Sequence, residues 1–133
     1  MAVSGTVLER RVAQLHASGA TGALAGNRIG LEKEGLRVAA SGRLSQSPHP
    51  PALGSALTHP YITTDFSEAL LELITPALTQ PQAVLDFLRD IHLYVYRHLG
   101  DELLWATSMP CVLDRAARIP LAPYGSSNAA TMK

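Results

Sequence analysis

Two short stretches of the sequence carry acidic residues at spacings that suit metal-ion chemistry. In the first, Glu32 and Glu34 lie two positions apart within residues 29–38, which read as a β-strand. Successive strand side chains point to opposite faces, so both carboxylates project from one face, about 7 Å apart. Two unit charges at that separation repel by about 2.4 kcal/mol at an effective dielectric constant of about 20. A solvated strand tolerates this repulsion, whereas a cleft requires a cation.

The second acidic stretch covers residues 61–76. Asp65 directly follows the β-branched run at 62–64, and Glu72 lies within the apolar run 69–75. Burying an ionised carboxylate in such a run is costly unless the group is paired or binds a metal. The alternative for Glu72 is a place on a partly solvated strand face.

The four carboxylates together define a hypothesis about chemistry. If Glu32, Glu34, Asp65 and Glu72 converge, Mg²⁺ or Mn²⁺ is the expected cation, because hard divalent ions prefer carboxylate oxygens and commonly bridge to substrate phosphates. The chemistry would then be metal-assisted phosphoryl transfer, in which the ion offsets charge on the phosphates. Glu68 is ambiguous: on a continuous strand it would share the face of Glu72, but a bend near Ser67 would break that alternation.

The remaining strands are expected at residues 61–64 and 69–75. β-branched and aromatic residues favour the first of them. For the second, a helix over 67–73 is the competing interpretation, since Ala and Leu favour helices. The alternation of Leu71, Leu73 and Thr75 against their neighbours, together with the short length, favours a strand.

Two helices are expected to flank the strands. The first covers residues 7–17, where Thr6 and Glu9 form a capping box. The second covers 80–99, begins with a capping box of Thr79 and Gln82, and ends before Gly100. Its apolar residues recur every three or four positions: Val84, Leu88, Ile91, Val95 and Leu99. That stripe predicts a helix that covers one face of a sheet.

Composition narrows the class of protein. The 133 residues carry 11 basic and 11 acidic side chains, so the formal net charge is zero. The balanced charge therefore gives no reason to expect a nucleic acid or an anionic membrane surface as a partner. No apolar run approaches the roughly 20 residues that a membrane helix needs. Cys111 is the only cysteine, which precludes an intrachain disulfide and favours a reducing compartment, the cytoplasm.

Other candidate residues carry weaker signals. The sequence has neither a GxxxxGK[ST] nor a GxGxxG phosphate loop, so the residues identify no nucleotide-binding or catalytic group. The five histidines show no zinc-type spacing. Cys111 is expected to be a buried, inert thiol. The loop from Tyr124 to Asn128 is rich in hydrogen-bonding side chains and could bind a polar ligand, although turn composition explains it equally well.

Four segments resemble the amino-terminal part of a known family. The segments read GLEKEGLRV, HPPALGSALTHPYITTDFSEALLELITP, SMPC and YGSSN, and the likeness runs nearly continuously from about Arg28 to Lys133. They are similar to glutamate–cysteine ligases, also called γ-glutamylcysteine synthetases, of the proteobacterial type. Since members of that family are several times longer, residues 1–133 are expected to be the N-terminal portion of one larger catalytic domain.

The resemblance implies an activity and a fold. Such a ligase joins the γ-carboxyl group of L-glutamate to the amine of L-cysteine, with ATP as co-substrate and an acyl phosphate as intermediate, in the first step of glutathione synthesis. The implied fold is α+β, part of a glutamine-synthetase-like curved antiparallel sheet that forms a funnel with helices packed outside. The family's metal-ligand carboxylates fall on Glu32, Glu34, Asp65 and Glu72, where they would hold Mg²⁺ or Mn²⁺.

Two alternatives stay open from the sequence. The first is another glutamate-activating carboxylate–amine ligase with a different amine substrate. The second is a non-catalytic metal-binding or interaction fragment. The nucleotide and amino-acid pockets would lie beyond Lys133 in the family, so this chain alone is expected to be inactive. The sequence does not indicate an oligomeric state.

Overall fold

A four-stranded antiparallel sheet forms the centre of the structure, a computed structural model that describes residues 6–113 and 118–123. The strands are β1 (Glu32–Val38), β2 (Ile62–Thr64), β3 (Leu70–Ile74) and β4 (Leu103–Leu104). Their order across the sheet is β2-β3-β1-β4, so the two strands that carry acidic residues are the central ones. The expected strand over 69–75 is confirmed and the competing helix is wrong.

The register between β1 and β3 determines which side chains share a face. Glu34 pairs with Glu72, and Gly35 pairs with Leu71. β3 in turn pairs with β2, where Thr63 lies opposite Glu72. β4 is only two residues long and pairs with β1 at Arg37 and Val38 alone, so it leaves the Glu32–Gly35 edge of β1 uncovered.

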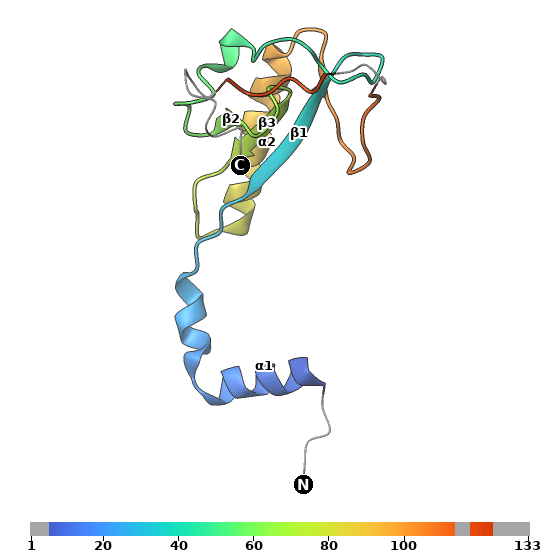
Figure 1. The fold of residues 1–133 in the computed structure, drawn as a ribbon. Helices are drawn as coiled ribbons and strands as arrows, with labels where there is room; N and C mark the ends of the chain where they lie inside the picture. Colours follow the sequence, from blue (N-terminus) through green and yellow to red (C-terminus); the bar gives the residue numbers. More distant parts are fainter. Residues whose placement is uncertain (1–5, 114–117, 124–133) are drawn as a thin grey trace.

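Helix α2 (Pro81–His98) covers one face of the sheet (Figure 1). The predicted apolar stripe is confirmed, because Val84, Val95 and Leu99 are buried while Leu88 and Ile91 pack against the core. The core cluster also contains Ile62, Leu71 and Leu73 from the sheet and Leu53 from the short 3₁₀ helix η2 (Pro51–Leu53). The opposite face of the sheet carries the acidic residues.

The start of α2 differs from the prediction. Gln80 is the N-cap residue, and its side chain makes no capping hydrogen bond, so the Thr79–Gln82 capping box is wrong. Pro81 occupies the first turn, where its missing N–H would have no partner in any case. Burial of the apolar stripe therefore fixes this helix without help from a cap.

Helix α1 (Val7–Ala17) forms with the predicted bounds and the predicted Thr6–Glu9 capping box. None of its residues is buried, and the apolar side chains Leu8, Val12 and Leu15 are exposed. Figure 1 shows α1 well apart from the sheet, followed by the 3₁₀ helix η1 (Ala20–Gly26). Of the two α-helices in the described residues, α2 packs on the sheet and α1 does not.

The expected α+β class, an antiparallel sheet with a helix packed on its outside, is confirmed. Within the described residues, no helix combines the length and the apolar character that a membrane crossing requires.

Candidate metal-binding face

The centre of the candidate site is the Glu34–Glu72 pair on neighbouring strands. The Thr75 N–H donates to the Leu31 carbonyl, and the Arg37 N–H donates to the Ala69 carbonyl. These bonds place the odd-numbered residues of both strands in the hydrogen-bonded pairs, so Glu34 and Glu72 form a non-hydrogen-bonded pair. Side chains approach most closely in such pairs, where Cα atoms lie about 4.5 Å apart. Like charges directly opposite each other are destabilising.

Two further carboxylates flank this pair. Glu32 lies two residues before Glu34 on β1 and therefore shares its face. Asp65 follows β2, two residues after Thr63, which lies opposite Glu72. Glu32, Glu34 and Asp65 are exposed, whereas Glu72 is half-buried between strands on both sides. Three of the four predicted site residues therefore lie on the central strands β1 and β3, and the fourth, Asp65, directly follows β2.

The charges of the other three carboxylates act on the carboxyl group of Glu72. Partial burial raises the pKa of Glu72 above its ordinary value, and the charges of Glu32, Asp65 and Glu34 raise it further. Each of these causes disfavours the charged form of a carboxyl group. The three predicted partners of Glu72 thus lie close enough to destabilise its anion.

The donor set fits a hard divalent cation. In the described part of the chain, no Lys, Arg or His forms a salt bridge with Glu32, Glu34 or Glu72. Carboxylate oxygens are the ligands that Mg²⁺ and Mn²⁺ prefer. As the described side chains stand, no three His, Cys, Asp or Glu residues are closely enough grouped to hold an ion.

A cavity of about 350 Å³ lies beside Glu34 on the uncovered edge of β1. It is also lined by Leu36 and Leu70 from the two central strands and by residues 107–110. The carboxylate of Glu34 therefore borders a space that can accept a small ligand.

Glu68, which the sequence left ambiguous, does not join the carboxylate face. A turn precedes β3, in which the Leu70 N–H donates to the Ser67 carbonyl at 2.9 Å. Glu68 consequently lies outside the strand and is buried, and its Oε1 accepts a hydrogen bond from the backbone N–H of His49 at 2.7 Å. The bend near Ser67 therefore breaks the alternation.

Sequence reasoning missed Arg37, the largest fully buried side chain. Its Nη1 donates to Glu102 Oε2 at 2.7 Å, and its Nη2 donates to the carbonyls of Ser47 and Glu68. These bonds tie β1 to the loop after it and to the segment before β3, which supports the strands that carry the carboxylates. Residue 37 is an odd number of positions from Glu32 and from Glu34, which places its side chain on the opposite face of β1. That alternation was the sequence signal for a side chain on the packed face.

Two weaker predictions have different outcomes. Cys111 is buried and forms no disulfide, as expected for a packed thiol. The Tyr124–Asn128 loop lies outside the described residues, so its proposed ligand contact stays a prediction.

Known proteins resemble nearly the whole length of this chain. The sequence profile of the glutamate–cysteine ligase family matches residues 12–133. A glutamate–cysteine ligase of Alcanivorax borkumensis is 56% identical over 126 residues, and that of Sodalis glossinidius is 61% identical over 111 residues. These matches cover 95% and 84% of this chain but 24% and 21% of the relatives. The chain thus spans about a fifth to a quarter of the length of the curated relatives it matches.

Two solved structures are also similar to this chain. A crystal structure of a glutamate–cysteine ligase from Francisella tularensis in complex with AMP matches with a TM-score of 0.71 and 39% identity, over 78% of this chain and 21% of that one. A bifunctional glutathione synthetase from Pasteurella multocida matches with a TM-score of 0.67 and 39% identity, over 75% of this chain and 14% of that one.

Proposed function

The chain belongs to the glutamate–cysteine ligase family, and we propose that it supplies the carboxylates that hold the catalytic magnesium of such a ligase. The observation that supports this proposal is that Glu32, Asp65 and Glu34 lie near enough to Glu72 for their charges to raise its pKa. A folded protein keeps four acidic groups on one half-exposed face at a cost, and a bound cation offsets that cost.

The reaction that we propose is a property of the longer protein, because this chain spans about a fifth to a quarter of its relatives. ATP phosphorylates the γ-carboxyl group of L-glutamate, the amine of L-cysteine attacks the acyl phosphate, and ADP and phosphate leave. The relative crystallised with AMP supports an adenine nucleotide as co-substrate. When bound, Mg²⁺ or Mn²⁺ would offset the charge of the ATP phosphates and of the phosphoryl group in transfer.

The described residues have separate roles in this proposal. Glu34 and Glu72 would bind the cation from directly opposite positions on two hydrogen-bonded strands, which fixes their spacing through the backbone. Glu32 and Asp65 would complete the carboxylate set from either side. Arg37 would position β1 through its buried bonds to Glu102 and to the Glu68 carbonyl on the opposite face.

Cellular context is also a proposal. A single cysteine suits the reducing cytoplasm, where L-glutamate, L-cysteine and ATP would be the small-molecule partners. The balanced charge gives no reason to propose a nucleic acid or a membrane surface as a partner.

The test is ligation by the longer protein that contains this sequence. We expect ADP to form only when L-glutamate, L-cysteine and Mg²⁺ are all present. Glu34→Gln should abolish ligation with little change in melting temperature, because it removes a ligand and also relieves repulsion. Asp101→Asn, at an exposed acidic residue just after α2, is the matched control and should retain activity. ADP release at the full rate without cysteine would contradict the proposal, as would an active Glu34→Gln variant.

A further inference from the structure

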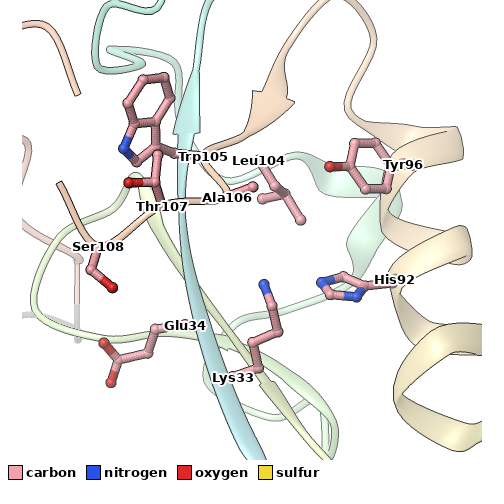
Figure 2. Close-up of a pocket in the computed structure, with 9 residues that line it drawn as sticks. All are labelled: Lys33, Glu34, His92, Tyr96, Leu104, Trp105, Ala106, Thr107 and Ser108. Atoms are coloured by element: carbon pink, nitrogen blue, oxygen red, sulfur yellow. The ribbon is translucent and has the colours of Figure 1, made fainter. Parts of the chain in front are cut away.

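A second, larger pocket of about 600 Å³ lies between β1, α2 and residues 104–108. Figure 2 shows Lys33 and His92 on one side of β1, with Tyr96 above them, while the carboxylate of Glu34 points away on the other side of the strand. The pocket occupies the place beside β1 where a longer β4 would have paired. Its volume lies within the range of about 300–1,000 Å³ that is typical of small-molecule sites.

Lys33 gives this pocket a cation that the protein itself does not neutralise. The side chain is half-buried, and among the described residues no carboxylate forms a salt bridge with it. Its Nζ lies over Gly35, only 3.7 Å from where a Cβ at that position would be, so the glycine leaves room for the ammonium group on the strand face. An ammonium group in a partly desolvated pocket gains from a bound anion.

Neutral hydrogen-bonding groups also line the pocket. The His92 ring and Tyr96 lie on the Lys33 side of β1, while Thr107 and Ser108 lie on the side of Glu34 (Figure 2). Burial and the neighbouring charge of Lys33 lower the pKa of His92, so its imidazole is neutral at neutral pH. Leu104, whose Cδ2 also lies beside Gly35, adds apolar surface next to Lys33, and the Trp105 ring adds it on the other side of β1 (Figure 2).

We propose that this pocket binds a small molecule through an oxyanion, a carboxylate or a phosphoryl group, with Lys33 as its cationic partner. The Tyr96 hydroxyl would donate a hydrogen bond to the same anion, and the apolar side chain of Leu104 would contact the rest of the ligand. Glu34 also borders this pocket, but its carboxylate points to the other side of β1, so the anion at Lys33 would lie across the strand from the proposed cation site (Figure 2). The proposal does not depend on the ligase activity.

Trp105 makes the proposal measurable, because it is the only tryptophan of the chain and it lines the pocket. Its fluorescence is followed while the 133-residue chain is titrated with inorganic phosphate or with acetate, and sodium chloride keeps the ionic strength constant. We expect a saturable change with at least one anion and none with chloride. Saturation by phosphate alone assigns the site to phosphoryl groups, and saturation by acetate alone assigns it to carboxylates.

Variants identify the residue responsible. Lys33→Gln should weaken binding about tenfold or more, the loss expected when a charge-assisted hydrogen bond is removed. Lys33→Arg, which keeps the charge, should restore most of it. Arg97→Gln, at an exposed cation on α2, is the control and should bind like the original chain. Absence of saturation with both anions at about 100 mM, or equal binding by Lys33→Gln, would overturn the proposal.

Discussion

At the scale of single residues, the account depends on the carboxyl group of Glu72. It lies between Glu34 on one strand and Thr63 on the other, and it is less exposed than the three acidic groups around it. Its position therefore combines partial desolvation with three like charges, and both effects raise its pKa.

The first prediction concerns the interaction between Glu34 and Glu72. Glu34→Gln removes one of the negative charges that raise the Glu72 pKa, so that pKa should fall toward its ordinary value. The measurement is an NMR titration of the Glu72 side-chain carboxyl carbon in the metal-free chain. Asp101→Asn should leave the Glu72 titration unchanged. An unaltered Glu72 pKa in Glu34→Gln would show that the two groups do not interact.

The second prediction is the pH dependence of stability. Because the folded-state pKa of Glu72 is raised, the folded chain holds this proton more tightly than the unfolded chain does. The contribution of Glu72 to folding stability is therefore lost as pH rises from the unfolded pKa through the folded one. Melting temperatures of the metal-free chain and of Glu72→Gln should diverge in favour of the variant as pH rises from about 4 to 7. Divergence in the opposite direction would contradict the assigned environment.

At the scale of elements, two helices with similar sequence patterns have different roles. The α2 stripe packs on the sheet, whereas the α1 stripe of Leu8, Val12 and Leu15 remains exposed. Apolar residues at helical spacing indicate that one face of a helix is apolar. They do not indicate which other element packs against that face.

The third prediction compares one valine from each helix. Val95 is 0% exposed and Val12 is 45% exposed. Val95→Ala should lower the free energy of unfolding by about 2 kcal/mol through lost burial and a new cavity, while Val12→Ala should change it by less than about 0.5 kcal/mol. Urea denaturation of both variants provides the measurement. Equal losses would mean that α1 is packed as tightly as α2.

The sequence was informative wherever local pattern and local chemistry agree. Alternation in 69–75 identified β3, and the Thr6–Glu9 pair identified the start of α1. Spacing placed Glu32 and Glu34 on one strand face. Their convergence with Asp65 and Glu72 was a hypothesis from residue type, and the family resemblance implied the same four residues. The register that sets Glu34 opposite Glu72 depends on long-range pairing, which no local pattern encodes.

Long-range packing also explains what the sequence did not reveal. The buried Arg37 bonds to Glu102, 65 residues away along the chain, so its partner is not visible locally. The missing cap of α2 reflects tertiary burial that outweighs a local signal. The pocket at Lys33 is lined by residues 104–108, where β4 ends, and their position beside β1 depends on long-range pairing.

At the scale of the whole molecule, the formal net charge is zero, but acidic and basic side chains lie on opposite faces of β1. One face of β1 presents Glu32 and Glu34, and the other presents Lys33 and the buried Arg37. The acidic face would attract a cation and the Lys33 side an anion, so one strand separates two sites of opposite preference. The packed side of the sheet holds this arrangement in place through α2.

The measurement that tests the central claim most directly is calorimetric titration of the 133-residue chain with Mn²⁺. We predict saturable binding that Glu34→Gln and Glu72→Gln each weaken about tenfold or more, with Asp101→Asn unchanged. Equal Mn²⁺ affinity in all four proteins, or no binding to the original chain, would contradict the assignment of this face as a metal site.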